Sequence, residues 1–290
     1  MINRRVIFCA NQVSLCIATT LVEKEKAYIN TTVFFDRLRC DTNVFRKLEI
    51  DLIHFSKWNF IKFLFKSFFI RPNEVCVPHF KGGRLIRVYA KYAKRISAID
   101  DGLDTFREIP KNIVVSDFKH GSNYYTFKYD FPLATWLQKF NIVRVCELGE
   151  IAKSCKEILE LNDFEVVLIE SPGIEIVSLA DFEFAKLLLV KHSNPNKNRE
   201  THMCFPSVAG SDFALEKSLK NFRGTIVVGE SMTAVYSLML KSPAFKLVVA
   251  IQDDNKKNLV SLVQLLNIKK HAMLWHAGYN IFDVKNKIVK

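Results

Sequence analysis

Two adjacent acids and a glycine follow a short apolar run. Ile99 is succeeded by Asp100, Asp101 and Gly102. Two neighbouring carboxylates can raise one another's pKa, which makes one of them suitable as a base that takes a proton from a hydroxyl group. Glycine after the acids permits backbone angles that other residues rarely adopt. Because Asp-Gly is also common in ordinary turns, a solvated turn is the alternative interpretation.

A lysine and a histidine end another apolar run. Lys191 and His192 follow Leu189-Val190, and Pro195 comes three residues after the histidine. Two cations at a strand end could neutralise a phosphate or protonate a leaving oxygen. A histidine that caps an ordinary loop is the alternative.

A third segment combines a strand, a glycine, two hydroxyl residues and a helix. Thr225 to Val228 has the pattern of a buried strand, and it is followed by Gly229 and by the hydroxyl residues Ser231 and Thr233 at the start of a stretch with helical apolar spacing. A helix start offers free backbone N–H groups and a positive dipole end, to which Ser231 and Thr233 add hydroxyl donors. These features suit a phosphate, although a serine is also a common helix cap.

Several other kinds of site lose support from the sequence. A Walker loop, a G-x-G-x-x-G fingerprint, an H-E-x-x-H pair and a G-x-S-x-G elbow are all missing. The seven cysteines are scattered and form no C-x-x-C pair, so neither a disulfide framework nor a zinc site is expected. A reducing cytoplasm is the simplest location for such a chain.

Short apolar runs alternate with helical patterns along the chain, which predicts parallel βα units. An irregular, aromatic-rich stretch, residues 123–137, interrupts this order. A boundary near Asp163 predicts two α/β domains, residues 1–162 and 163–290, with the last segment packing back on the first domain. The predicted strands are 6–10, 32–35, 50–54, 74–78, 95–99, 143–146, 166–170, 186–191, 224–229 and 245–250, and the predicted helices are 13–26, 43–48, 59–69, 84–94, 148–161, 212–219 and 231–240.

The charge predicts an anionic partner. The chain has a formal net charge of +12 and a pI near 9.3, which suits nucleic acid, a membrane surface or a phosphorylated or acidic substrate. No apolar run reaches the about 18 to 20 residues of a spanning helix. The helix predicted over 59–69 is apolar on most sides with Lys62 and Lys66 one turn apart; a core helix is favoured over a membrane-surface helix.

The order of these motifs resembles that of bacterial sialyltransferases, the group of lipooligosaccharide sialyltransferases and capsular polysialyltransferases. That group carries an acid-acid-Gly motif, a His-Pro motif and a Ser/Thr pair. Asp100-Asp101-Gly102 matches the first motif. His192 is separated from Pro195 by two residues, and Met232 separates Ser231 from Thr233, so the other two motifs depart from the pattern. Residues 8–12 and 205–219 resemble the family's opening loop and its segment with a nucleotide-binding acid.

The resemblance implies a GT-B-like α/β fold, with two Rossmann-like domains whose parallel sheets face a central cleft. It implies transfer of sialic acid from CMP-sialic acid to a lipooligosaccharide or capsular glycan, inverting the anomeric carbon, with no cofactor and no metal. Asp101, or Asp100, is then the base and Glu216 contacts the cytidine ribose. His192 is a further catalytic residue, which stabilises the leaving phosphate. The CMP-sugar is held by the remaining candidates: Lys191, Gly229, Ser231 and Thr233.

Several alternatives remain open at this point. Another CMP-sugar such as Kdo, or another nucleotide-sugar, could be the donor. A basic nucleic-acid-binding protein is a second class, given the aromatic residues beside Lys128, although we expect no nucleic-acid partner. A family member that binds glycan without catalysis is a third. We expect a glycolipid or oligosaccharide acceptor and a cytoplasmic protein, and leave open a homodimer and peripheral contact with the inner membrane.

Overall fold

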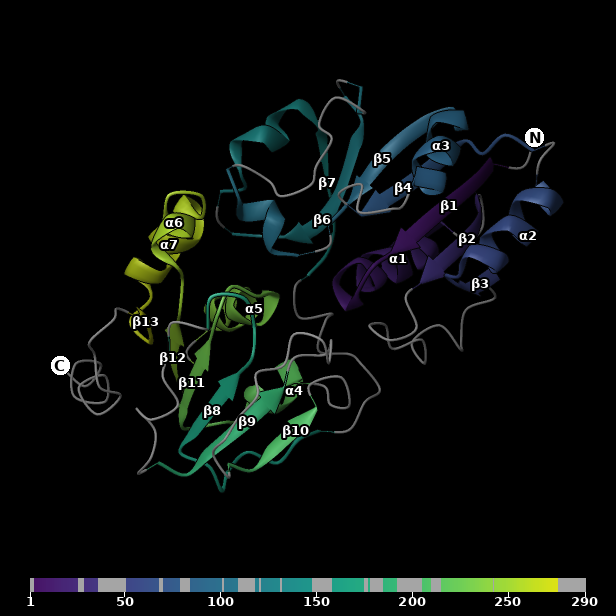
Figure 1. Cartoon of the computed structure of the whole chain (residues 1–290). Coiled ribbons are helices and arrows are strands. Elements are labelled where there is room, and N and C mark those ends of the chain that lie inside the picture. The colour runs from purple at the N-terminus through teal and green to yellow at the C-terminus, as the bar shows by residue number, and fades with distance from the viewer. Residues whose placement is uncertain are drawn as a thin grey trace. The chain divides into compact units, whose positions relative to one another are not determined.

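The computed structural model divides the chain into two compact α/β units (Figure 1). Unit 1 comprises residues 1–105, 109–129 and 133–155, and unit 2 comprises 106–108, 130–132 and 156–290. The predicted boundary lay after residue 162, and the structure changes units at 155/156. The structure describes residues 3–25, 29–35, 51–67, 70–78, 84–100, 102–108, 118–119, 121–130, 132–147, 158–174, 177, 185–191, 205–209, 215–241 and 243–275.

Unit 1 is built on a seven-stranded sheet in the order β3-β2-β1-β4-β5-β6-β7, and all its strand pairs are parallel. A parallel sheet needs a crossover between successive neighbours, and helices supply several of them. The elements are β1 (Asn3–Cys9), α1 (Gln12–Glu25), β2 (Ile29–Phe35), β3 (Asp51–His54), α2 (Lys57–Ser67), β4 (Glu74–Pro78), α3 (Arg84–Tyr92), β5 (Arg95–Ile99), η2 (Leu103–Phe106), β6 (Asn123–Lys128), η4 (Thr135–Lys139) and β7 (Asn141–Glu147).

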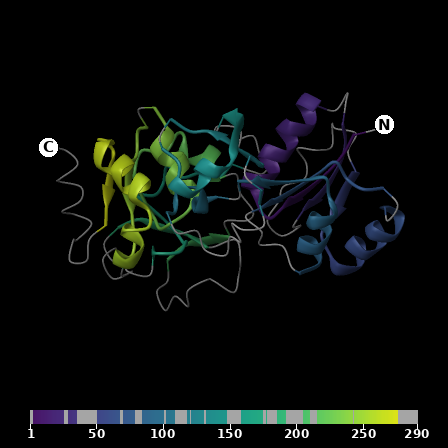
Figure 2. The same cartoon turned by 90° about the horizontal axis from the view of Figure 1, so that it is seen from above.

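Helices cover both faces of this sheet. Figure 2 shows α1 on one side of it and α2 with α3 on the other. Alternate residues of a strand point to opposite faces, so Val6 and Phe8 of β1 face α2 and α3. There Phe8 stacks on Phe34 at 5.1 Å between ring centroids, and Phe60 of α2 contacts Tyr89 of α3 edge-on at 5.6 Å. Aromatic packing therefore fixes the two helices against the sheet and against each other.

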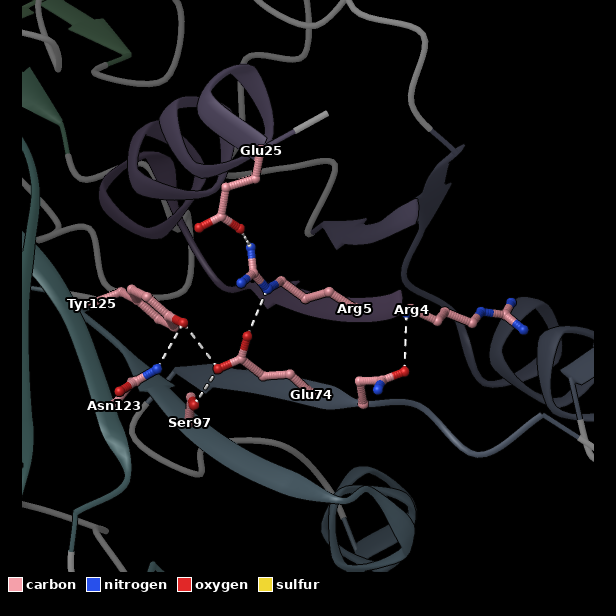
Figure 3. Close-up of polar contacts among 8 residues, drawn as sticks. Arg4, Arg5, Glu25, Glu74, Ser97, Asn123 and Tyr125 are labelled. Carbon is pink, nitrogen blue, oxygen red and sulfur yellow. Dashed lines mark hydrogen bonds and ion pairs between the residues drawn. The ribbon is translucent and has the colours of Figure 1, made fainter. Parts of the chain in front are cut away.

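The opposite face of the sheet contains a buried polar network (Figure 3). Arg5 Nε donates to Glu74 Oε2 at 2.7 Å, and Arg5 also pairs with Glu25 of α1. Ser97 and Tyr125 donate to the other Glu74 oxygen at 2.5 and 2.9 Å. Buried charges persist only when they are paired and hydrogen-bonded, as here. The network lies toward the amino-terminal ends of β1 and β4, so it binds α1 to the sheet and is not positioned for chemistry.

Unit 2 is built on a six-stranded parallel sheet in the order β10-β9-β8-β11-β12-β13. Its central strands are buried along their whole length, as expected for a sheet covered on both faces. The elements are β8 (Val166–Ile169), β9 (Leu187–Lys191), β10 (Ser207–Ala209), α4 (Leu215–Leu219), β11 (Thr225–Val228), α5 (Met232–Met239), β12 (Lys246–Val249), α6 (Asp253–Lys256), α7 (Val260–Ile268) and β13 (Ala272–Leu274).

The prediction of two parallel α/β sheets is confirmed. Residues 123–128, expected to be irregular, form β6, in which Tyr124 and Phe127 are fully buried. Aromatic residues favour strands, and the stretch lacked the alternation that would have shown it. No helix or strand was predicted at β10, α6, α7 or β13. The helices predicted over 43–48 and over most of 148–161, and the C-terminal segment from 276, lie outside the described residues. The central cleft stays a prediction.

Among the described residues, no helix combines the length and apolarity needed to cross a bilayer.

Candidate functional site

The centre of the unit 2 sheet has a topological switch point, at which the direction of the strand connections reverses. The chain enters this sheet at β8, adds β9 and β10 on one side, and then places β11, β12 and β13 on the other. The connections after β8 and β11 therefore lead in opposite directions, and ligands of open α/β sheets bind at such a switch point, at the carboxyl ends of the strands. The residues that follow β8 and β11 are Glu170 to Gly173 and Gly229 to Ser231.

The loops after β8 and β11 are in close contact. Gly229 N donates to Ser171 Oγ at 2.7 Å, and a Cβ on Gly229 would stand 2.2 Å from the Pro172 carbonyl oxygen. Gly173 adopts φ +90°, and a Cβ there would stand 2.7 Å from the Ala250 carbonyl oxygen after β12. Distances this short exclude any side chain, so both positions require glycine. Gly229, predicted as a ligand contact, thus has a packing role at this edge.

The amino-terminal end of α5 presents the two predicted hydroxyl residues. Ser231 is the N-cap, with extended backbone, and its Oγ accepts from Ala234 N at 3.3 Å. Thr233 Oγ1 donates to Glu216 Oε1 of α4 at 3.4 Å. Burial, and then the Glu216 charge, raise the pKa of Tyr236. The structure therefore brings together three of the predicted residues, with a carboxylate beside the hydroxyls at a helix start.

The strand register adds Lys191 to the same edge. Ile169 at the end of β8 pairs with Val190 of β9, and Glu170 N donates to the Val190 carbonyl oxygen at 2.9 Å. Lys191 therefore lies level with Glu170, one strand away from the switch point, and is half-buried. His192 and Pro195 lie outside the described residues.

A buried ion pair supports the loop after β11. Arg107 Nη2 donates to Glu230 Oε2 at 2.6 Å, and the side chains are 6% and 1% exposed. Arg107 belongs to the short segment 106–108, which precedes most of unit 2 by about fifty residues yet is part of it. Glu108 N also donates to the Asn258 carbonyl oxygen at 2.9 Å. Glu230 is thereby committed to its partner and holds the residue before Ser231 in place.

In unit 1, Asp100 is an anchor at the carboxyl end of β5. Its carboxylate is 0% exposed, and each of its two oxygens accepts two hydrogen bonds. Oδ1 accepts from Gly102 N at 2.9 Å and Thr105 Oγ1 at 2.7 Å. Oδ2 accepts from Thr126 Oγ1 at 2.7 Å and Tyr129 OH at 2.9 Å. Burial, and then the Asp100 charge, raise the pKa of Tyr129 well above its usual value, so the phenol remains a donor.

This geometry disfavours Asp100 as a base, and the role predicted for Asp101 stays a prediction. A base must reach the proton it takes, and the Asp100 oxygens are enclosed by protein donors. Gly102 adopts φ +134°, in the region that glycine tolerates, so the glycine of the motif has a conformational reason. Asp101 itself lies outside the described residues.

Sequence reasoning missed several residues of these sites. Glu170-Ser171-Pro172-Gly173 follows a buried strand, and the Pro-Gly turn was a usable signal for a loop at the carboxyl edge. Arg107 and Thr126 gave no signal, because their partners Glu230 and Asp100 lie 123 and 26 residues away in the chain.

Unit 2 also has a hollow at the opposite edge of its sheet. A hollow of about 1080 Å³ opens at the amino-terminal ends of β8, β11 and β12, lined in part by Glu165, Lys220, Arg223 and Lys246. This is the edge opposite to the switch point, so it is a surface hollow and not the ligand site expected for the fold.

Within the described residues, no group of three or more His, Cys, Asp or Glu side chains could hold a metal ion.

No family model matches the sequence, and no curated protein matches it significantly. Solved structures do resemble it in fold. The crystal structure of the glycotransferase of kitacinnamycin superposes with a TM-score of 0.55 at 10% identity, covering 99% of this chain and 89% of that one. A 2,6-sialyltransferase from the Vibrionaceae Photobacterium sp. JT-ISH-224, solved with the donor product CMP and the acceptor substrate lactose, gives a TM-score of 0.53 at 9% identity. It covers 94% of this chain and 78% of that one.

At these identities the similarity concerns the fold. The chain therefore has the two-sheet GT-B fold of glycosyltransferases.

Proposed function

We propose that the protein is a glycosyltransferase that transfers sialic acid from CMP-sialic acid to a cell-surface glycan. The observation that carries the proposal is the edge at β11 and α5, where a helix start, two hydroxyl residues and a carboxylate gather in a GT-B fold. The helix start suits a phosphate, and the carboxylate suits ribose hydroxyls. A nucleoside monophosphate such as CMP has both a phosphate and a ribose to be bound. The fold shared with a sialyltransferase that was solved with CMP supports this donor.

The proposed reaction is an inverting displacement. The acceptor hydroxyl oxygen attacks the anomeric carbon, and the bond from that carbon to the CMP phosphate oxygen breaks. Asp101 takes the hydroxyl proton as the new bond forms. CMP leaves with the bonding electron pair, and an inverted glycoside results.

Charge that develops on the leaving phosphate would be stabilised at the unit 2 edge. Ser231, Thr233 and the N–H groups that begin α5 supply donors, and Lys191 supplies a positive charge from the end of β9, two strands away from β11. His192 follows Lys191 directly in the chain and would add a second cation. Glu216 would accept from the cytidine ribose. In this mechanism the chain's own cations and donors do the work, and no cofactor takes part.

The test is release of CMP from CMP-sialic acid, with and without lipooligosaccharide or sialylated oligosaccharide acceptors. We expect release that the acceptor stimulates, and its loss in Asp101→Asn. Asp254→Asn removes an exposed acid of α6 and serves as the matched control, expected to behave as wild type. CMP-Kdo, UDP-sugars and ADP-heptose as donors distinguish other nucleotide-sugar transferases. No release and no CMP binding by the wild type would overturn the proposal.

A further inference from the structure

Helix α2 carries its most exposed side chains where a soluble helix normally carries polar ones. Phe60 and Phe63 face the sheet and are buried, at 1% and 6% exposure. Trp58 and Phe65 are 73% and 79% exposed. At 100° per residue these two lie almost directly above one another, on the side opposite the core. The sequence prediction of a core helix therefore describes one side of α2 only, and the outer side is an aromatic stripe.

Helix α3 extends this apolar surface. Tyr89 of α3 packs edge-on against Phe60 and Phe63 at 5.6 and 6.0 Å, so the two helices are neighbours on one face of the sheet (Figure 2). Val88 and Tyr92 point outward from α3, at 64% and 47% exposure. We call the exposed residues of the two helices the α2–α3 outer face: Lys57, Trp58, Lys62, Phe65, Val88, Lys91 and Tyr92. Exposed apolar groups clustered in this way indicate an interaction surface.

The charge on this part of the chain has one sign. Residues 52–99 include ten lysine and arginine residues and one acid, Glu74. Glu74 is buried and pairs with Arg5 on the other face of the sheet (Figure 3), so it does not offset the cations outside. Lys57, Lys62 and Lys91 are exposed on the α2–α3 outer face itself. The partner of this face must therefore accept aromatic side chains and carry negative charge.

We propose that the α2–α3 outer face docks on an anionic lipid bilayer, with α2 lying in the plane of the interface. Trp58 and Phe65 enter the boundary between headgroups and acyl chains, where aromatic residues are favoured, and the flanking lysines reach anionic headgroups. A second copy of this chain is a poorer occupant, because a two-fold contact would place the lysines of both copies against each other. The inference is independent of the proposed transferase activity, since lipid binding needs no sugar donor.

The test is sedimentation of the full-length protein with sucrose-loaded vesicles of phosphatidylcholine alone or with phosphatidylglycerol. We expect binding to the anionic vesicles only, and weaker binding at high salt. Trp58→Ser combined with Phe65→Ser should lower the partition coefficient at least about tenfold, since two buried aromatic groups are lost. Lys62→Gln and Lys91→Gln should each lower it about fivefold, from about 1 kcal/mol per basic residue at such a surface.

Matched controls come from unit 2. Ile268→Ser removes an apolar side chain that is 74% exposed on α7, and Lys217→Gln removes an exposed lysine of α4. Both should bind vesicles as wild type does. Equal binding by wild type and the Trp58/Phe65 double variant would overturn the proposal. So would concentration-dependent dimerisation of the wild type that the double variant abolishes in analytical ultracentrifugation, because the face would then be a self-contact. Unchanged circular dichroism checks that each variant is folded.

Discussion

The carboxyl edges of the two sheets are held in different ways. In unit 1 a side chain does the holding: the buried Asp100 carboxylate accepts from Gly102, Thr105, Thr126 and Tyr129. In unit 2 the backbone does so: Gly229 approaches Pro172 so closely that a side chain has no room. In unit 1 the anchored Asp100 is followed in the chain by a second acid, Asp101. In unit 2 the close approach is followed by backbone N–H groups and hydroxyls at the start of α5.

This difference suits two kinds of chemistry. A carboxylate beside an anchored residue can accept a proton, and a helix start with hydroxyl donors can hold an anion. Substitution of the proposed base should therefore lower the rate, and substitution of the hydroxyl residues at the start of α5 should lower CMP binding. Substitution of the residues that hold either edge, Asp100 or Gly229, should lower stability.

The largest effect is expected at Asp101. Asp101→Asn removes the proposed base and should lower kcat about 10²- to 10⁴-fold, with little change in KM or in the free energy of unfolding. Steady-state CMP release and urea denaturation measure the two quantities. A loss of stability as large as the one expected for Asp100→Ala would show that Asp101 shares the anchoring role of Asp100. The proposed distinction between an anchor and a base would then be wrong.

Gly229→Ala should be the most destabilising change at the unit 2 edge. The new Cβ would meet the Pro172 carbonyl oxygen at 2.2 Å, so the backbone must move, at a cost of about 3 kcal/mol. Gly121→Ala is the control: its φ is +81° but nothing lies within 4 Å, so backbone strain alone should cost about 1 kcal/mol. Equal losses of unfolding free energy for the two variants in urea denaturation would contradict the close approach of Gly229 to Pro172.

Asp100→Ala should lower the free energy of unfolding by about 2 kcal/mol. The hydroxyls of Thr126 and Tyr129 would lose a buried acceptor. Hydrogen exchange should accelerate in β5 and β6 more than in β8 and β11. Asp130→Ala removes an exposed acid next to Tyr129 and should be near neutral. Uniform acceleration in both units would argue against a local anchor.

Ser231→Ala should cost about 1 kcal/mol through the lost N-cap and should also weaken CMP binding. Isothermal titration calorimetry measures the second effect. Ser261→Ala alters a buried serine on α7 and should leave CMP affinity unchanged. If Ser231→Ala binds CMP as tightly as wild type, its hydroxyl is a cap and no more.

The smallest effect on stability is expected when the pH is lowered through the titration range of His271. Burial, and then the charge of Lys269, lower the pKa of His271 below its usual 6.5, although its hydrogen bond with the Ser237 carbonyl oxygen acts the other way. The unfolded chain then binds more protons than the native one between the lowered value and 6.5. The stability contribution is complete above pH 6.5 and is lost as pH falls below it. His271→Gln should flatten this part of the curve in thermal denaturation.

Local patterns predicted much of each sheet. The bounds of β4 and β5 agree with the predicted strands, and the acids after β5 and the hydroxyls after β11 do follow strand ends. Such signals depend on the polarity of a few consecutive residues, which a strand or a helix start constrains directly. The strand β6 was missed because its aromatic residues are buried on both faces and show no alternation.

The sequence by itself determined the alternation of strands and helices, the acid-acid-Gly turn, the hydroxyl pair at a helix start and the basic, aromatic character of residues 52–99. Only the tertiary structure decided that Asp100 is buried, that Thr233 meets Glu216, that Arg107 supports Glu230, and that Trp58 and Phe65 face outward. These outcomes depend on strand order and on which helix covers which face. Contacts between residues 17 to 123 positions apart follow from that order, and short-range polarity does not encode it.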